Sequence, residues 1–204
     1  MATTLFLVRH AAHSRVADTL CGRMPGVALS PPGQAQAEQI AQWLQDEQVN
    51  ALYTSPLQRC QETAAPLARV LGLKPISDEA LVEIDFGEWT GARFAALQND
   101  SRWTRWNARR DDAAAPGGET MAAVRDRVAG RMAELAALYP EGRLLLVSHC
   151  DVIRAAMCHL LGLPMQGYER FEIAPGSLST AVIWPGGGKV LSLNERPRQR
   201  IPAA

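Results

Sequence analysis

The sequence has few features that would tie it to a membrane, a nucleic acid or a secretory route. No apolar run among the 204 residues approaches the length of a membrane span. The opening residues, MATTLFLVRH, have only Leu5 to Val8 as an apolar run and no basic residue before it, which argues against a secretory signal. The chain has 21 Lys and Arg against 21 Asp and Glu, so no bulk positive charge recommends nucleic acid or an anionic membrane as a partner.

Cysteine is scarce, and its spacing forms none of the paired patterns that hold metal ions. The four cysteines are Cys21, Cys60, Cys150 and Cys158. They form no close CxxC pair, and no HExxH motif is present, so no metal site is expected. We expect a reduced, cytoplasmic setting in which these thiols act as small hydrophobic side chains.

Strand-like and helix-like segments alternate along the chain. Strands are predicted at 3–8, 50–54 and 143–147, helices at 32–47, 56–71, from the PGGE turn (116–119) to 138 and at 150–161, a loop at 81–91, and a closing hairpin at 178–184 and 189–193. This alternation predicts an α/β fold, a three-layer sandwich in which helices cover both faces of a mostly parallel central sheet. We expect a single domain over 1–204, with a short cap insertion around 92–115 and a frayed tail over 194–204.

Local signals support the helix at 32–47. Ser30 is placed to cap its start, where prolines fit the first turn. Ile40, Trp43 and Leu44 recur at helical spacing and are expected to form its apolar face.

Two of the predicted strands end in titratable side chains. Arg9 and His10 follow the first strand, and Ser148 and His149 follow the strand at 143–147. Reactive loops in α/β sheets lie beyond the carboxyl ends of strands, and charged groups there need partners. A hydrogen-bonded structural pair would explain Arg9 and His10 taken alone. If the two strands are neighbours, the imidazoles meet in one crevice, where such a ring can serve as nucleophile or proton carrier.

Arg59 lies one turn into the helix that follows Ser55 and Pro56. The start of a helix offers unpaired N–H groups and a positive dipole end, which favour an anion. Taken alone, Arg59 is more simply explained as a solvated helix residue.

These residues belong to a series of six sequence motifs. They are LVRHA at 7–11, LSPPGQAQA at 29–37, TSPLQRCQETA at 54–64, EIDFGEWTG at 83–91, PGGET at 116–120 and VSHCDVIRA at 147–155. In order and spacing they resemble the histidine phosphatase superfamily, also called phosphoglycerate mutase-like, over nearly the whole chain. The resemblance implies a metal-independent phosphatase with no cofactor, which acts on a small phosphorylated substrate as a monomer or homodimer.

The resemblance also implies roles for single residues. His10 is the expected nucleophile that becomes phosphohistidine, and Glu83 is the expected proton donor and acceptor. Arg9, Arg59 and His149 are expected to hold the phosphoryl oxygens. Further candidates for substrate contact are Gly22, Cys150 and Ser14.

These roles agree with what phosphoryl transfer requires. Two guanidiniums can fork onto phosphoryl oxygens and neutralise charge that a metal ion neutralises elsewhere. His10 must be unprotonated at its attacking nitrogen, so its other nitrogen is expected to donate to a backbone carbonyl. Nearby cations are expected to keep Glu83 ionised in the free enzyme, until a bound phosphate dianion offsets them.

The sequence departs from the family's usual pattern around both histidines. The run AAH at 11–13 stands where the family usually has glycine, then often Glu and Ser or Thr. Val16 stands where a polar residue that touches phosphate is common, and Ser14 is a candidate to replace it. Cys150 stands where glycine commonly follows the second histidine. Substrate preference is therefore left open.

Two other chemistries use these residues less well. Cysteine phosphatases need an arginine after five intervening residues, whereas Arg154 lies only four positions after Cys150. A metal site built from His10, His13 and Asp151 has no recognised ligand spacing.

The segment 102–111 is basic and aromatic, which suits either a nucleic-acid surface or a lid helix. Asp111, Asp112 and the zero net charge favour the lid. Trp103 and Trp106 would anchor it on one face. The other face carries a stripe of three arginines, Arg102, Arg105 and Arg109. The stripe points either into the pocket, where it can hold a second anionic group of the substrate, or into solvent.

Two alternative functions remain. Phosphoglycerate mutases of this kind usually have a longer insertion before the PGG turn and a C-terminal segment that shields the pocket. Here the span from Gly91 to Pro116 is short and the tail is brief, which favours an open pocket and hydrolysis. The other alternative is a catalytically dead phosphate-binding module, and the presence of all five core residues argues against it.

Overall fold

The computed structural model describes residues 1–197, and a six-stranded sheet of order β3-β2-β4-β1-β5-β6 forms its centre. The strands are β1 (Thr3–Arg9), β2 (Ala51–Thr54), β3 (Pro75–Ser77), β4 (Arg143–Ser148), β5 (Leu178–Trp184) and β6 (Gly187–Glu195). The first four run parallel to their neighbours among themselves, and β5 and β6 are antiparallel. The predicted mostly parallel sheet is confirmed.

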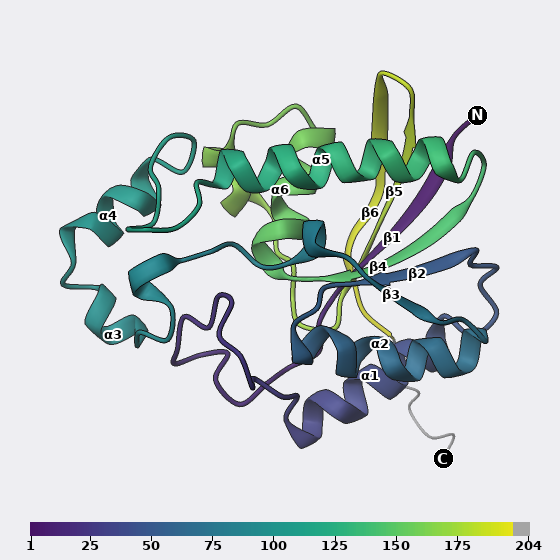
Figure 1. Cartoon of the computed structure of the whole chain (residues 1–204), viewed down its shortest axis with the longest axis horizontal. Helices are drawn as coiled ribbons and strands as arrows, with labels where there is room; N and C mark the ends of the chain where they lie inside the picture. The colour runs from purple at the N-terminus through teal and green to yellow at the C-terminus, as the bar shows by residue number, and fades with distance from the viewer. Residues whose placement is uncertain (198–204) are drawn as a thin grey trace, which may run out of the picture.

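Helices cover both faces of this sheet (Figure 1). On one face lie α1 (Pro31–Trp43) and α2 (Gln58–Leu71), and on the other α5 (Met121–Leu138) and α6 (Cys150–Leu160). Alternate side chains of β1 serve the two faces. Phe6 and Val8 join the apolar cluster of α1 and α2, whereas Leu5 and Leu7 join that of α5 and α6. The predicted three-layer sandwich is confirmed.

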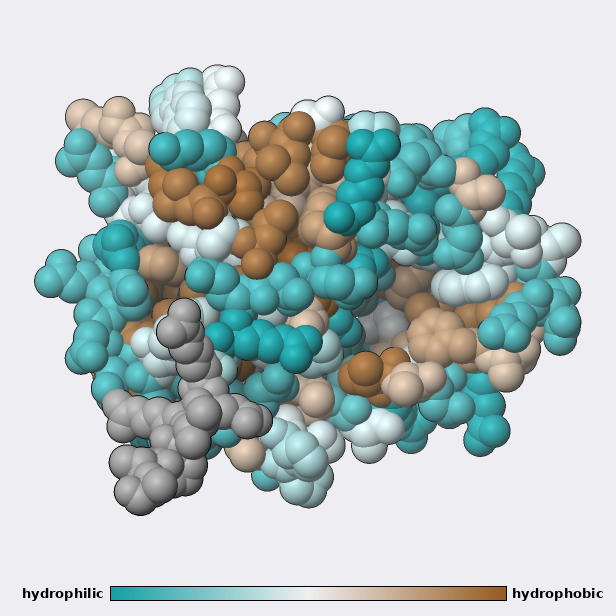
Figure 2. Space-filling view, turned by 180° about the vertical axis from the view of Figure 1, so that it is seen from behind, coloured by the Kyte–Doolittle hydropathy of each residue, from teal (hydrophilic) through white to brown (hydrophobic). Residues whose placement is uncertain are grey.

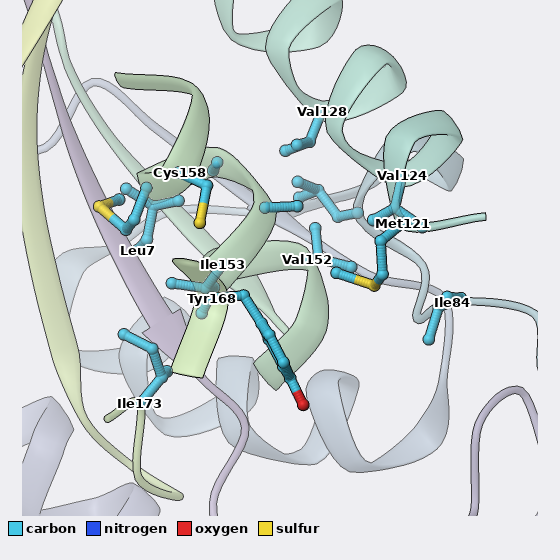
Figure 3. Packing of buried hydrophobic residues seen from close by; sticks show 14 of the residues in the cluster. Leu7, Ile84, Met121, Val124, Val128, Val152, Ile153, Cys158, Tyr168 and Ile173 are labelled. Carbon is cyan, nitrogen blue, oxygen red and sulfur yellow. The ribbon is translucent and has the colours of Figure 1, made fainter. Parts of the chain in front are cut away.

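The larger of the two cores lies beneath α5 and α6. Met121, Val124 and Val128 recur at three- and four-residue steps and face Val152 of α6 (Figure 3). Burying each such side chain is worth about 1.5–3 kcal/mol. This packing fixes α6, and with it the carboxyl end of β4, against the rest of the molecule.

The helix boundaries agree with the predictions within a few residues, and Ser30 caps α1 through its Oγ, which accepts the Gly33 N–H at 3.2 Å. Trp43 does not belong to the buried apolar face of α1, since it is 38% exposed.

The prediction of a frayed tail is wrong for Asn194 and Glu195, which belong to β6. Asn194 is held there because its Oδ1 accepts the Ala174 N–H at 2.7 Å. Residues 198–204 of the expected tail lie outside the described residues.

Two short helices follow the predicted loop, α3 (Phe94–Leu97) and α4 (Ser101–Ala108). Figure 1 shows them at the same end of the molecule as the segment that follows β1. Trp106 is buried and stacks on Trp103 with 5.2 Å between ring centroids. The helical, tryptophan-anchored character expected of this insertion is therefore present.

The surface carries scattered large apolar side chains. Seen from behind, some apolar side chains gather among polar ones (Figure 2). The large apolar side chains that are exposed, over all faces of the described residues, are Met1, Trp43, Ile76, Leu138, Leu161, Trp184 and Leu191. Within residues 1–197, none of the helices combines the length and the hydropathy that a membrane crossing requires.

Candidate active site

Three neighbouring parallel strands bring titratable side chains to one edge of the sheet. β2, β4 and β1 lie side by side, so the chain segments that leave their carboxyl ends start close together. His10 follows β1, Ser55 follows β2 and His149 follows β4. The rings of His10 and His149 lie 5.2 Å apart between centroids, at 62° to each other. The expected meeting of the two imidazoles is confirmed.

One hydrogen bond sets the tautomer of His10. Its Nδ1 lies 2.8 Å from the carbonyl oxygen of Ala11. A carbonyl oxygen only accepts, so Nδ1 carries the hydrogen and Nε2 keeps its lone pair. Burial, then Arg59 and Arg9, lower the pKa of His10 well below its usual value. The ring is therefore neutral and nucleophilic at Nε2, as a backbone-held imidazole was expected to be.

Two arginines, Arg9 and Arg59, reach the site with some N–H groups that have no hydrogen-bond acceptor. Arg9 donates through NH1 to the carbonyl oxygen of Ile173 at 2.6 Å, and Arg59 donates through NH2 to that of Gly22 at 2.7 Å. The Nε of Arg9 and the Nε and NH1 of Arg59 are buried with no partner in the described part of the chain. Buried cationic donors without acceptors are costly, so an anion is the natural ligand for these nitrogens.

Glu83 is buried beside these cations, and its Oε1 accepts the N–H of Ile84 at 3.0 Å. Burial raises the pKa of Glu83 to about 8, helped by Asp151 and opposed by Arg59 and Arg9. The carboxyl group therefore holds a proton at neutral pH. The expectation that cations keep Glu83 ionised in the free enzyme is wrong, because desolvation outweighs their attraction.

His149 lies at the N-terminus of α6 and is fully buried. Its Nε2 is 2.7 Å from the Oγ of Ser55 and 3.4 Å from the Sγ of Cys60. Burial, followed by Arg59, lowers the pKa of His149 well below its usual value. His149 can therefore offer a neutral N–H donor rather than a second imidazolium.

Helices α1 and α2 clamp the segment that follows His10. A Cβ on Gly33 would lie 1.8 Å from the carbonyl oxygen of Ala12, so only glycine lets α1 approach this closely. The backbone N–H of Ser30 donates to the same oxygen at 3.0 Å. On the other side, Ala11 donates its N–H to the Oγ of Thr63 at 3.0 Å. These contacts give the LSPPG motif a role beyond the predicted helix cap, and they explain the QET motif, to which the sequence assigned no role.

A polar network around Glu119 fixes the loop that carries Glu83. The Glu119 carboxylate accepts from Arg23 at 2.8 Å, from Arg127 at 3.2 Å and from the backbone N–H of Asp85 at 3.0 Å. Arg23 also donates through Nε to the carbonyl oxygen of Glu83 at 2.8 Å. Sequence reasoning missed this support, although the PGGET motif was the signal for it.

The remaining candidates for substrate contact are Gly22, Cys150 and Ser14, and their positions differ from one another. Gly22 meets the site through the carbonyl oxygen that holds Arg59. Cys150 is half-buried, and burial is the main cause that raises the pKa of its thiol to about 12, so the thiol stays protonated. Ser14 is exposed, whereas its neighbour His13 is buried against His10.

The arginine stripe of the cap faces solvent. Arg102 is exposed and donates to Asp100 at 2.8 Å and to Glu88 at 3.1 Å. Arg109 is exposed and pairs with Asp112. Arg105 is exposed as well. Of the two orientations left open by the sequence, the structure shows the solvent-facing one.

The sequence assigns His13 no role other than that of a possible metal ligand. In residues 1–197, no three side chains of His, Cys, Asp or Glu are grouped so that they could hold a metal ion. The ring of His13 instead stacks on that of His10, with 5.4 Å between centroids and 29° between planes. Sequence spacing alone does not fix the orientation of a ring on a loop, which is why this contact was missed.

Comparison with known proteins places these features in one family. The family model described as histidine phosphatase superfamily (branch 1) matches residues 5–196. Phosphoserine phosphatase 1 of Hydrogenobacter thermophilus is 31% identical over 195 residues, which cover 93% of this chain and 91% of that protein. A probable phosphoglycerate mutase, GpmB of Cronobacter sakazakii, is 30% identical over 177 residues, with 86% and 82% covered.

A solved structure shows the same likeness. Native mycobacterial glucosyl-3-phosphoglycerate phosphatase superposes with a TM-score of 0.85 at 27% identity, and the match covers 95% of this chain and 99% of that one. The structural similarity therefore extends over nearly the whole chain.

Proposed function

This chain belongs to the histidine phosphatase superfamily, and we propose that it hydrolyses phosphomonoesters of small metabolites through a phosphohistidine at His10. One observation carries the proposal. The neutral ring of His10, held by Ala11 at Nδ1, stands beside two arginines, Arg9 and Arg59, that keep buried N–H groups without acceptors. A nucleophile next to an unfilled anion site is what phosphoryl transfer requires.

The reaction has two steps, and Glu83 donates a proton in the first and accepts one in the second. The Nε2 lone pair of His10 attacks phosphorus while the bond to the substrate oxygen breaks, and Glu83 gives its proton to that oxygen. Arg9, Arg59 and His149 hold the nonbridging oxygens as charge moves. Water then attacks phosphorus, its proton passes to Glu83, the phosphorus–nitrogen bond breaks and phosphate leaves.

The protonation states of the free protein support this division of roles. The pKa of Glu83 is raised to about 8, so the acid of the first step is already protonated at neutral pH. The pKa of His10 is lowered, so the nucleophile is already deprotonated. Two groups whose environments push their pKa values in opposite directions are typical of an acid and a nucleophile that work together.

We also propose a single domain over 1–204 with its cap around 92–115, acting as a monomer or homodimer in the cytoplasm, with no metal ion, other cofactor or nucleic-acid partner. The family model spans nearly the whole length, which supports one domain. The four cysteines are free thiols, which supports a reducing compartment. The balanced charge supports a small substrate rather than a polyanion.

A phosphate-release screen tests the proposed function. A panel of phosphomonoesters that includes phosphoserine, sugar phosphates and aryl phosphates would be offered in EDTA to wild type, His10→Ala and the exposed control His159→Ala. We expect phosphate release by wild type and His159→Ala and none by His10→Ala. Activity that disappears in EDTA and returns with a divalent ion would contradict the metal-free chemistry. Faster transfer to a phosphoglycerate acceptor than to water would favour the mutase alternative.

A further inference from the structure

His13 lies against the proposed nucleophile. Its ring stacks on that of His10 at 5.4 Å between centroids, while His149 approaches the same ring at 5.2 Å. His13 is only 8% exposed although it stands on the loop after β1. The ring is therefore largely shielded by the neighbouring side chains.

A hydrogen bond fixes which nitrogen of His13 is the donor. Nδ1 accepts the backbone N–H of Arg15 at 3.3 Å, so this nitrogen carries no hydrogen. In a neutral ring the hydrogen is then on Nε2, which points away from that backbone contact. Nε2 takes part in no hydrogen bond within residues 1–197, and it is not one of the fully buried polar atoms that lack a partner there, so a ligand can reach it.

The charges that act on His13 favour an anionic partner for this donor. Burial is the main cause that lowers the pKa of His13 to about 4, and Arg59, Arg9 and Arg15 lower it further. The ring is therefore neutral, and it lies in a positive field that two of the proposed phosphoryl-binding arginines create. An N–H donor in such a place suits a phosphoryl oxygen.

Neither of the two positions in this loop that were candidates for phosphate contact supplies a buried donor. Val16 is apolar and half-buried, and the side chain of Ser14 is exposed. His13 alone among these three packs on His10.

We infer that His13 is a phosphoryl-binding residue whose Nε2–H donates to a nonbridging oxygen, first in the substrate and then on His10. The inference rests on the proposed function, because it assumes that the phosphoryl group is bonded to Nε2 of His10. Stacking alone would keep the plane of His10 fixed, but it would not require a hydrogen on Nε2 of His13.

Two substitutions separate the donor from the stack. His13→Phe keeps a ring that can stack on His10 but has no donor. His13→Gln removes the ring and places an amide N–H close to the position of Nε2. His159→Phe is the matched control, since His159 is exposed on α6. The probes are inorganic vanadate and inorganic phosphate, measured by calorimetry, alongside kcat and KM for one phosphomonoester.

We expect His13→Phe to bind both anions about ten- to a hundredfold more weakly, with a similar fall in kcat/KM, because one hydrogen bond to a charged oxygen is lost. His13→Gln should lose roughly fivefold or less, because its amide restores that bond. His159→Phe should match wild type. Thermal unfolding of each variant verifies that it is folded.

Two results would overturn the inference: wild-type anion binding by His13→Phe, or equal losses in His13→Phe and His13→Gln. If the phenylalanine variant does not fold, His13→Asn replaces it, because its shorter amide does not reach the position of Nε2 and should lose as much. Failure of the proposed function would look different. Anion binding needs no turnover, so it reports on His13 even if wild type releases no phosphate or His10→Ala keeps turning over.

Discussion

The NH2 group of Arg59 donates to the carbonyl oxygen of Gly22 at 2.7 Å, and this bond orients a guanidinium whose Nε and NH1 have no partner within residues 1–197. Gly22 has φ +47°, and a Cβ there would lie 2.9 Å from Cδ2 of Phe86. Only glycine suits this backbone and this space, so the loop can present its carbonyl to Arg59. Gly22 thus serves the site as a positioning residue.

Replacing Arg59 should abolish anion binding without unfolding the protein. We expect Arg59→Met to lower kcat/KM by at least about a hundredfold, because a charged group that stabilises the transferring phosphoryl is lost. The free energy of unfolding should not fall by more than about 1 kcal/mol, since a buried cation with unpaired N–H groups is removed. Vanadate should raise the melting temperature of wild type but not that of Arg59→Met.

Arg69→Met is the control for that experiment, because Arg69 is on the same helix, is exposed and pairs with Glu38. It should keep full activity and the full vanadate effect. Equal stabilisation of Arg59→Met by vanadate would show that Arg59 does not hold the anion.

The raised pKa of Glu83 should make folding stability fall as pH rises. The folded protein keeps the Glu83 proton up to about pH 8, whereas the unfolded chain loses it near the usual value of 4.5. Between these values the folded state binds more protons, so the free energy of unfolding decreases by up to about 1.4 kcal/mol per pH unit. Urea titrations from pH 5 to 8 on wild type and Glu83→Gln measure the difference, and the glutamine variant should lack this slope.

Glu79→Gln, an exposed carboxylate of the same region, should retain the wild-type pH dependence. If Glu83→Gln and wild type show the same slope, Glu83 is ionised at neutral pH and our account of its protonation is wrong.

Glu83→Gln should also discriminate between leaving groups. A poor alkoxide leaving group needs a proton, and a good aryloxide does not. We therefore expect the rate of phosphohistidine formation to fall at least about tenfold more for an alkyl phosphate than for an aryl phosphate. Rapid-quench measurement of the first turnover isolates this step from hydrolysis of the intermediate. Equal losses for both substrates would remove the proton-donor role.

Glu119 should matter to both stability and activity although it does not belong to the five core residues. Glu119→Ala removes the acceptor for Arg23, Arg127 and the backbone of Asp85, which hold the Glu83 loop. We expect a loss of about 1–3 kcal/mol in the free energy of unfolding and a fall in kcat. Glu134→Ala, which removes only an exposed pair with Arg131, should change stability by less than about 0.5 kcal/mol.

Apolar patterning made most of the fold predictable. The run from Leu5 to Val8 is apolar on both faces, as a central parallel strand must be, and it is buried on both faces in β1. The strand β3 was missed because it has three residues and none of them is buried, so it carries no pattern. The end of β6 was missed because Asn194 is held by hydrogen bonds to distant backbone and side chains rather than by burial.

The sequence predicts those site residues that directly follow a buried strand. His10 and His149 were found because both follow buried strands, and strand order then brings them together. The protonation of Glu83 was not predictable, because it depends on burial and on Asp151, a residue distant in sequence. The stacking of His13 on His10 depends on how a loop folds back, which no local pattern records.

The central claim is that His10 receives the phosphoryl group. A wild-type sample mixed with a radiolabelled phosphomonoester and quenched in base within milliseconds should carry base-stable, acid-labile label. Peptide mapping should place that label on His10, and His10→Ala should carry none while His13→Gln and His159→Ala still do. Label on another residue, or phosphate release at the wild-type rate by His10→Ala, would contradict the account.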